Sequence, residues 1–421
     1  MAHVGRSLAL VARIALAGSL AGGCATFRPQ PLDRVGFLPR ALTKSDGGLV
    51  VSAAALGGEE SRQAFDADLA AMGIQPVWLE IRNGESEPYI LFPIALDPDY
   101  FSPLEVAWKS HRWLGGAING EIDRYFYERR MPLEIDPGET ARGFVFTNLD
   151  LGRKPVNVVL VGDQDVRSVP LTVPVPGLRT DRDDLDLDAL YRPDQVADLD
   201  LDGLRRALVA MPCCTTDARG SVRGDPLNLA VVGTEDALAA AFAQRGWDDV
   251  ETLHTGSALA TVRSFLFGTS YRYSPVSPLY VFGRRQDLAF QKARATVHER
   301  NHLRLWRAPL RWNDLPVWVG QISRDVGVRW TSRTWNLTTH AIDPDVDEAR
   351  TYLVQDLVSS ERVAHLGFVS GVGRAAIGEP RSNLTGDPYF TDGLRAVFVL
   401  TEEPVSFRQI DILPWDEMDE D

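Results

Sequence analysis

The chain has 421 residues, of which 44% are hydrophobic and 24% are charged, so it is long enough for two or three folded domains. Its 58 acidic side chains exceed its 44 basic ones and give a formal net charge of -14. This balance argues against a nucleic-acid binder, which presents a basic face, and against broad electrostatic adhesion to anionic lipid. Only 3 cysteines are present, so no ordinary disulfide framework exists.

The first residues are typical of a secretory signal peptide, because Arg6 and Arg13 precede a short apolar stretch that ends in small residues before Cys24. This stretch is shorter than the roughly 20 residues that cross a bilayer core. An ordinary secretory signal that contains a cysteine is the alternative. We expect a lipoprotein: residues 1–23 are removed and Cys24 carries palmitate or similar acyl chains, of which stable anchoring needs at least two.

The residue after Cys24 bears on the membrane to which the protein is sorted. It is Ala25 rather than an aspartate. By analogy with enterobacterial sorting, the sequence predicts a lipid-anchored protein of the cell envelope, at the outer membrane and facing the periplasm.

Residues 24–46 contain several prolines and predict a tether that lifts the first domain off the membrane. In residues 47–178, short apolar runs alternate with turn residues, which predicts an all-β sandwich similar to immunoglobulin-like envelope modules. The clearest expected strands are Leu49–Ala53, Pro76–Ile81, Gly143–Phe146 and Val156–Val161, with short helices or loops at Asp66–Met72 and Leu104–Lys109.

An acidic linker is expected over residues 179–203, which are rich in aspartate. Three aspartates alternate ahead of a glycine, as at the opening of a calcium loop: Asp198, Asp200 and Asp202. An EF-hand loop would close with Glu, whereas position 209 is Val. We favour the alternative that Asp202 caps a helix over Leu204–Ala210, so no metal or cofactor is predicted.

Residues 204–224 are expected to hold that helix and a turn containing Cys213 and Cys214. Ordinary disulfides have alpha carbons about 5.5 Å apart, whereas neighbours across a trans peptide are about 3.8 Å apart. In an oxidising compartment the two cysteines therefore form either a distorted ring or two free thiols.

The rest of the chain predicts an α+β domain with a mixed sheet over residues 225–406, followed by an acidic tail over residues 407–421. Its expected helices are Glu235–Gln244 and a second that opens at Asp343-Pro344-Asp345 and runs to about Val358. Its expected strands are Leu227–Val232, Leu279–Phe282, His302–Arg307, Val317–Ile322, His365–Val369 and Arg395–Leu400.

Several motifs of this last domain occur together and in order: Asp225–Leu229, Ser277–Lys292, His302–Trp306, Pro316–Gly320 and Thr339–Asp345. Together they resemble the LssY carboxy-terminal domain. The resemblance implies membrane association, and the family name is linked to type I secretion. Relatives can carry this domain behind a phosphatidic-acid-phosphatase type membrane domain, of which this sequence shows no sign. No activity comes with the resemblance.

Eight residues of these motifs are candidates for a ligand or catalytic site: Arg284, Gln286, Asp287, Lys292, His302, Arg304, His340 and Asp343. On a strand, His302, Arg304 and Trp306 share one face and could bind an anion if His340 and Arg324 lie on neighbouring strands. The competing interpretation is structural: Gln286-Asp287 forms a turn, Arg304 pairs with an acid across the sheet, and Asp343 caps a helix.

Two enzyme classes compete with a binding role. The sequence His298–His302 spells the zinc motif H-E-x-x-H, but its last histidine begins a strand pattern, so a zinc protease is disfavoured. A hydrolase acting on a phosphoester or lipid through His302, His340 and Asp343 remains the alternative and requires these groups to share one pocket. The favoured expectation is a protein that binds an anionic or lipid-like ligand, or an envelope partner; whether it is an enzyme stays open.

Overall fold

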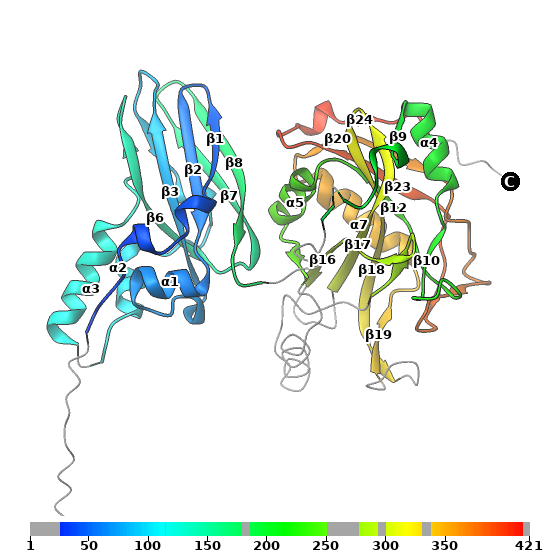
Figure 1. The fold of residues 1–421 in the computed structure, drawn as a ribbon, viewed down its shortest axis with the longest axis horizontal. Coiled ribbons are helices and arrows are strands. Elements are labelled where there is room, and N and C mark those ends of the chain that lie inside the picture. The colour runs from blue at the N-terminus through cyan, green and yellow to red at the C-terminus, as the bar shows by residue number, and fades with distance from the viewer. Residues whose placement is uncertain are drawn as a thin grey trace, which may run out of the picture.

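The protein is described by a computed structural model that covers residues 26–113, 115–178, 186–187, 189–250, 278–293, 300–330 and 338–415, without the side chains at 328–330 and 338–340. Two domains follow each other along the chain (Figure 1). The described part is mostly β-structure with six α-helices. None of its helices has the length and apolar character needed to cross a membrane. Cys24 lies outside the described residues.

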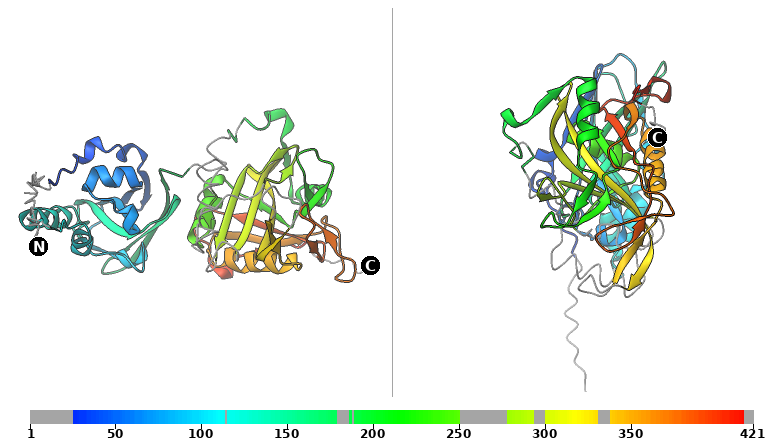
Figure 2. Two further views of the ribbon diagram at one scale, coloured as in Figure 1. Left: turned by 90° about the horizontal axis from the view of Figure 1, so that it is seen from below. Right: turned by 90° about the vertical axis from the view of Figure 1, so that its right-hand side faces the viewer.

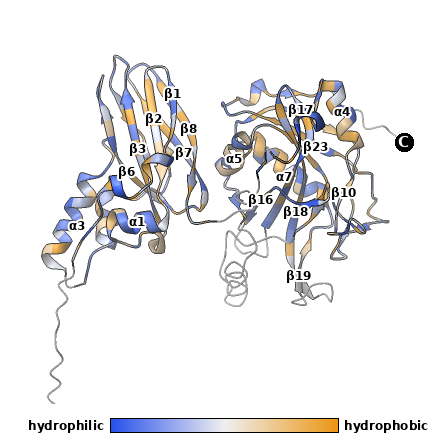
Figure 3. Ribbon diagram, in the orientation of Figure 1, coloured by the Kyte–Doolittle hydropathy of each residue, from blue (hydrophilic) through white to orange (hydrophobic). Residues whose placement is uncertain are grey.

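The first domain contains two four-stranded sheets, with the strand orders β1-β2-β3-β6 and β5-β4-β7-β8. Its strands are β1 Leu42–Asp46, β2 Leu49–Ala55, β3 Ile74–Asn83, β4 Tyr89–Leu91, β5 Glu134–Ile135, β6 Thr140–Asn148, β7 Gly152–Val161 and β8 Val166–Val175. Apolar side chains of both sheets alternate inward and form one core, in which Val51, Leu79, Val158 and Leu171 take part. The sandwich-like architecture and all four of the clearest strands predicted for it are present, and Figure 3 shows the hydrophobic residues along these strands.

The first domain is not purely β. It also contains α1 Gly58–Phe65, α2 Pro103–Lys109 and α3 Gly116–Glu128. These helices cover the outer face of the first sheet, where Phe65 and Phe126 pack against Phe144 and Phe146. The predicted sandwich therefore carries an additional helical layer, because the outer face of this sheet is apolar and needs a second layer.

Most of the segment that the sequence predicted as a tether is folded in the structure. Val35 and Phe37 are buried in the core beneath the helices, and two short 3-10 helices occupy Leu32–Arg34 and Leu38–Arg40. Phe27 packs edge-on against Tyr125 of α3, with 5.1 Å between the ring centres. Residues from 27 onward thus belong to the first domain.

The second domain is built on a ten-stranded mixed sheet with the order β13-β16-β17-β18-β12-β23-β20-β24, to which β9 and β19 add at β17 and β18. The strands are β9 Ala197–Leu199, β12 Leu229–Val232, β13 Asp248–Asp249, β16 Leu288–Ala293, β17 Arg300–Trp312, β18 Leu315–Trp330, β19 Thr338–Ile342, β20 Val363–Val369, β23 Arg395–Leu400 and β24 Asp411–Ile412. The predicted α+β class is confirmed. Every strand predicted from β17 onward is present, most of them longer than predicted.

Three layers make up this domain (Figure 2). Helices α5 Glu235–Gln244 and α7 Val346–Val358 pack on one face of the large sheet. The other face is covered by α4 Leu201–Ala210 and by a small sheet. The small sheet has the order β11-β10-β14-β15, with β10 Cys214–Thr216, β11 Arg223–Pro226, β14 Tyr280–Val281 and β15 Arg284–Arg285. A two-stranded ribbon, β21 Arg381–Ser382 and β22 Pro388–Tyr389, completes the elements.

The predicted domain ends need correction on both sides of this domain. Part of the expected acidic linker is a strand, because Leu310–Trp312 of β17 pair in parallel with β9. Part of the expected acidic tail is β24, which pairs with β20, and the neighbouring Leu413 and Trp415 are buried. Both segments contain a few apolar residues among the charged ones. These apolar residues pack against the sheet, which explains why both segments fold.

Candidate functional site

One face of β17 changes from polar to apolar along the strand. Arg300, His302 and Arg304 come first, and Trp306, Ala308 and Leu310 continue the same face into the cores beneath the small sheet and α4. The strand register sets three residues of β18 opposite the polar ones: Asp325, Ser323 and Gln321. Gln291 of β16 lies opposite His302 on the other side. We call these seven polar residues the buried polar face.

Hydrogen bonds tie this face together across the strands. The Nε2 atom of His302 lies 2.5 Å from Oδ2 of Asp325, and Arg300 donates to Oε1 of Gln291 at 2.5 Å. Arg304 donates to Oε1 of Gln321 at 2.9 Å. These side chains are nearly completely buried, with 4% of Arg300, 5% of His302 and 7% of Arg304 exposed.

The protonation of His302 follows from these neighbours. Burial lowers its pKa well below the usual value, and the charges of Arg300 and Arg304 lower it further. The imidazole is therefore neutral. Because Nε2 faces a carboxylate, it carries the proton and donates to Asp325, which leaves a lone pair on Nδ1.

Two buried polar atoms of the face have no hydrogen-bond partner among the residues that the structure describes. They are Nδ1 of His302, an acceptor, and Nε2 of Gln321, a donor. The two residues are diagonal neighbours on adjacent strands, a relation that puts alpha carbons about 7 to 8 Å apart. A buried polar atom without a partner costs about 1 to 3 kcal/mol, so a small group that satisfies both atoms is favoured here.

The small sheet and the β21–β22 region lie over this face. Leu279 and Val281 pack on Trp306, and Asp225 of β11 lies close enough to Arg304 to feel its charge. Burial raises the pKa of Asp225, while Arg304 and a hydrogen bond from Asn383 act in the opposite direction. The cover leaves little exposed surface on these side chains, which disfavours a bulky ligand.

The expected shared pocket of His302, His340 and Asp343 is not formed. His302 lies opposite Ser323 of β18, whereas His340 lies opposite Val328, five positions further along the same strand. That offset is about 16 Å at about 3.3 Å per residue, far beyond hydrogen-bond reach. The side chain of His340 is outside the described residues. The carboxylate of Asp343 accepts a hydrogen bond from the backbone N–H of Asp345, at the start of α7.

Two other candidates, Arg284 and Asp287, form a structural ion pair beside the small sheet, and a third, Gln286, makes a separate hydrogen bond there. Arg284 donates twice to Asp287, at 2.9 and 2.8 Å, and once to the hydroxyl of Tyr191. Asp287 also accepts from the backbone N–H of Arg307. Gln286 accepts from the backbone N–H of Leu279. Their contacts fit the structural interpretation of Gln286-Asp287.

Lys292 and Arg324 lie on the opposite face of the sheet. Lys292 pairs with Asp356 of α7 at 2.9 Å, and Arg324 donates to Asn301. Of the eight predicted site residues, the structure therefore places only His302 and Arg304 on the buried polar face, and Arg284 and Asp287 pair with each other elsewhere. Sequence reasoning missed the other five residues of this face: Arg300, Gln291, Gln321, Ser323 and Asp325. Arg300 continues the same period-two face and could have been found, whereas the other four depend on strand register.

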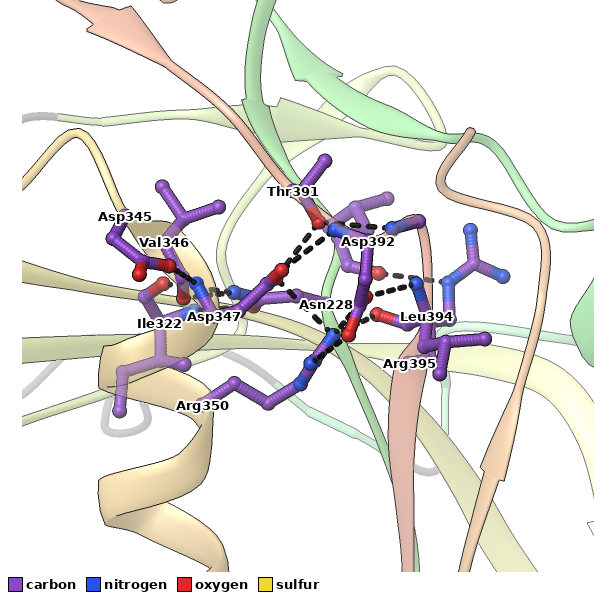
Figure 4. Close-up of polar contacts among 12 residues, drawn as sticks. Asn228, Ile322, Asp345, Val346, Asp347, Arg350, Thr391, Asp392, Leu394 and Arg395 are labelled. Carbon is purple, nitrogen blue, oxygen red and sulfur yellow. Dashed lines mark hydrogen bonds and ion pairs between the residues drawn. The ribbon is translucent and has the colours of Figure 1, made fainter. Parts of the chain in front are cut away.

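A second polar cluster joins the start of α7 to the turn before β23 (Figure 4). Arg350 of α7 donates to both carboxylate oxygens of Asp392, at 2.8 and 2.6 Å. Asp347 accepts from the hydroxyl of Thr391 and the backbone N–H of Asp392. Burial raises the pKa of Asp392, but hydrogen bonds from Arg350 and from the N–H of Leu394 outweigh it and lower the pKa. The charged groups of this cluster pair with one another, so the cluster is structural.

The structure also describes the residues that were candidates for calcium binding and for a disulfide. The described residues contain no group of three or more potential metal ligands, and Asp198, Asp200 and Asp202 are not gathered around one point. Asp200, not Asp202, caps α4, because its carboxylate accepts from the N–H of Gly203 at 2.7 Å. Cys213 and Cys214 are joined by a disulfide, with alpha carbons 3.8 Å apart.

Three hollows lined by described residues lie away from the buried polar face. Two of them, of about 290 and 550 Å³, lie between the domains and share Pro170, Ala240 and Arg362 in their walls. Another, of about 500 Å³, lies in the first domain and is lined mainly by apolar residues, including Phe101, Met131 and Phe144.

The fold therefore defines a two-domain protein in which a sandwich-like domain precedes an α+β domain with a polar face buried in its mixed sheet. The family model described as the LssY C-terminus matches residues 207–394. The chain thus carries an LssY-type C-terminal domain, as the resemblance predicted. The match includes β17 and β18 and hence most of the buried polar face. A comparison with curated proteins finds no match.

Proposed function

We propose that the protein is a lipid-anchored protein of the cell envelope whose second domain binds a small anionic group that also carries a proton, such as a phosphoryl group. The observation that carries the proposal is the pair of buried atoms without a described partner, Nδ1 of His302 and Nε2 of Gln321. A hydrogen phosphate satisfies both, because one oxygen accepts from Gln321 while its hydroxyl donates to His302. Arg300 and Arg304 supply positive charge beside it.

The phosphoryl group has two possible sources, free phosphate and a lipid headgroup. The anion test titrates the protein calorimetrically with inorganic phosphate and, separately, with a short-chain phosphatidic acid. The cover over the face favours the smaller ligand. We expect Gln321→Glu to weaken binding at least about tenfold, or ~1.4 kcal/mol. This variant keeps the oxygen that accepts from Arg304 but replaces the donor with a negative charge.

The matched control is Gln355→Glu, which makes the same change on an exposed position of α7. It should bind as the unchanged protein does. Equal binding by Gln321→Glu, or binding of neither ligand by the unchanged protein, would contradict the proposal. A high-resolution structure with only an ordered water between His302 and Gln321 would contradict it as well.

The proposed binding is linked to pH. Free His302 has a pKa well below its usual value, so it is neutral at ordinary pH. In the complex one proton lies at Nδ1, either on the ligand or on the ring. The dianion of a phosphomonoester such as phosphatidic acid lacks this proton, whereas the inorganic dianion HPO4²⁻ already carries it. Affinity for phosphatidic acid should therefore rise as pH falls from about 8 to about 6, with a weaker dependence for inorganic phosphate, and His302→Gln should remove much of the dependence for phosphatidic acid. The same titration series measures both effects.

The anchor is a separate part of the proposal and is supported by the sequence before Ala25. Cys24→Ser should release the protein from membranes or leave its precursor unprocessed, because the cysteine is the acylation site. Detergent partitioning and intact-mass measurement check this. Unchanged detergent partitioning of a fully processed variant would rule the anchor out. The outer membrane, facing the periplasm, remains the proposed location.

We also propose an immunoglobulin-like arrangement for the sandwich. Strands β2, β3 and β6 adjoin in one sheet, and β4, β7 and β8 adjoin in the other. This order parallels the A-B-E and C-F-G strands of immunoglobulin sheets, with β1 as an added edge strand. An experimental structure with another strand order would overturn the assignment.

A further inference from the structure

The helical end of the first domain exposes several large apolar side chains. Trp113, in the turn between α2 and α3, is 98% exposed, and Trp108 of α2 is 73% exposed. Leu104, one helical turn before Trp108, is 49% exposed, and Tyr127 of α3 is 48% exposed. We call Leu104, Trp108, Trp113 and Tyr127 the aromatic patch.

Tryptophan and tyrosine have an apolar ring and a polar tip, and both are enriched where a membrane meets water. Single exposed apolar residues are ordinary on a protein surface, but a group of large aromatic ones marks an interaction site. The apolar hollow of the first domain adjoins the start of α2. Its wall includes Ser102 and Pro103 together with Phe101 and Leu133, so the apolar surface extends beyond the exposed rings.

The described chain begins beside this patch. The backbone N–H of Arg28 donates to Oδ2 of Asp66 at 3.1 Å, and the guanidinium of Arg112 contacts the same oxygen at 3.3 Å. Asp66 thus links residue 28 to the residue that precedes Trp113. Phe27 packs on Tyr125 of α3, which fixes the chain start at a second point. Figure 1 shows the start of the described chain, in dark blue, running past α2 and α3.

This placement limits the distance between the proposed lipid and the patch. Cys24 precedes Phe27 by three residues, which span at most about 10 Å at about 3.3 to 3.6 Å per residue. No long tether intervenes, so acyl chains on Cys24 would hold the aromatic patch close to the bilayer.

The local charge around the aromatic patch also favours contact with a membrane. Although the whole chain carries -14, residues 103–130 contain five basic and four acidic side chains, without counting His111. Several of the cations adjoin patch residues: Arg130 lies over the ring of Tyr127 at 3.8 Å, and Lys109 directly follows Trp108. An anionic membrane surface therefore does not repel this end as it would repel the rest of the molecule.

We propose that the aromatic patch is a membrane-contact surface, with Trp108 and Trp113 in the interfacial layer of the bilayer to which Cys24 is anchored. The proposal rests on the proposed lipid anchor for the position of the membrane. The second domain lies at the opposite end of the molecule from α2 and α3 (Figure 2). Contact through the patch therefore holds the buried polar face away from the bilayer. On that side of the molecule, the face meets ligands from solution.

The test uses the mature chain from residue 24 with Cys24→Ser, which keeps every described residue but carries no lipid. Its partitioning onto vesicles of phosphatidylethanolamine and phosphatidylglycerol is measured by sedimentation. Combining Trp108→Ser with Trp113→Ser should weaken partitioning at least about tenfold, because each ring offers on the order of 150 to 250 Å² for burial at about 25 cal/mol per Å². Hydrogen exchange on vesicles should show protection of the described residues around 103–113.

The matched control combines Val166→Ser with Ile377→Ser, which removes apolar side chains that are 64% and 76% exposed outside the patch. This control should partition as the unchanged chain does. Equal partitioning of the tryptophan variant and the unchanged chain, including none for either, overturns the proposal. Intact mass of the protein from cells tests the lipid on its own, so failure of the anchor and failure of the patch are told apart.

Discussion

Buried arginines of the second domain are held by backbone carbonyls as well as by acids, and Arg395 is the strongest case. Its side chain is 0% exposed, and burial lowers its pKa to about 10. It donates to the carbonyl of Leu227 at 2.7 Å and to the carbonyls of Leu208, Met211 and Pro212 at and beyond the end of α4. One side chain thereby satisfies the open end of a helix and fixes it to the sheet.

Arg395→Met should destabilise the second domain by about 3 kcal/mol or more, because several buried carbonyls lose their donor at about 1 to 3 kcal/mol each. Arg395→Lys should recover only part of this loss, since a lysine has three donors on a point charge rather than a planar fork. Urea unfolding measures both variants. Arg408→Met, at an exposed position, is the control and should leave the midpoint unchanged. If Arg395→Met unfolds at the same urea midpoint as the control, this role of Arg395 is contradicted.

The sequence predicted only part of the candidate site, because the remaining residues are brought there by the pairing of strands. His302, Arg304 and Trp306 were placed on one face because strand periodicity is local information. Asp325 and Gln321 complete the face only through the β17–β18 register. Register depends on the turn and on the partner strand, so the sequence of one strand does not contain it. The same limitation allowed His340 to be grouped with His302, although the register separates them.

Secondary-structure elements were predicted well where a single local pattern decided the outcome. Helix α5 has the predicted bounds Glu235–Gln244, and α7 buries Val346, Ala349, Leu353 and Leu357 as the helical spacing indicated. Helix α3 was missed because its two glycines and charged residues obscure a weak apolar spacing, of which Ile122 and Phe126 are the buried part. Packing against the outer face of the first sheet, rather than local propensity, stabilises it.

Segments that fold against distant parts of the chain were the least predictable elements. Phe37 lies in a proline-containing stretch that reads as a tether, and Trp415 lies in a stretch that reads as an acidic tail. Both rings are buried because they pack in cores formed by strands from distant parts of the chain. A single aromatic residue among polar neighbours gives too little local signal to indicate this.

For the molecule as a whole, a partly buried charged contact joins the two domains. Arg153 of β7 donates to Glu235 at the start of α5, at 3.3 Å, and to Asp249 of β13, at 3.2 Å. Burial raises the pKa of Glu235 to about 7, and the nearby Asp236 and Asp249 raise it while Arg153 lowers it. One arginine thus faces two carboxylates, which makes this contact sensitive to protonation.

The sign of the resulting pH dependence follows from linkage. The pKa of Glu235 in the docked state, about 7, exceeds its ordinary value of 4.5, so the docked state binds the proton more tightly. Its contribution to docking is fully present below the ordinary pKa and is lost as pH rises through about 7. Small-angle scattering should therefore show a larger radius of gyration at about pH 8 than at about pH 5. Glu235→Gln, which mimics the protonated group, should remove most of the difference and keep the compact value at both. Glu402→Gln, at an exposed position beside the same interface, should retain the wild-type pH response. If Glu235→Gln responds to pH as the unchanged protein does, the carboxyl of Glu235 does not control the contact between the domains.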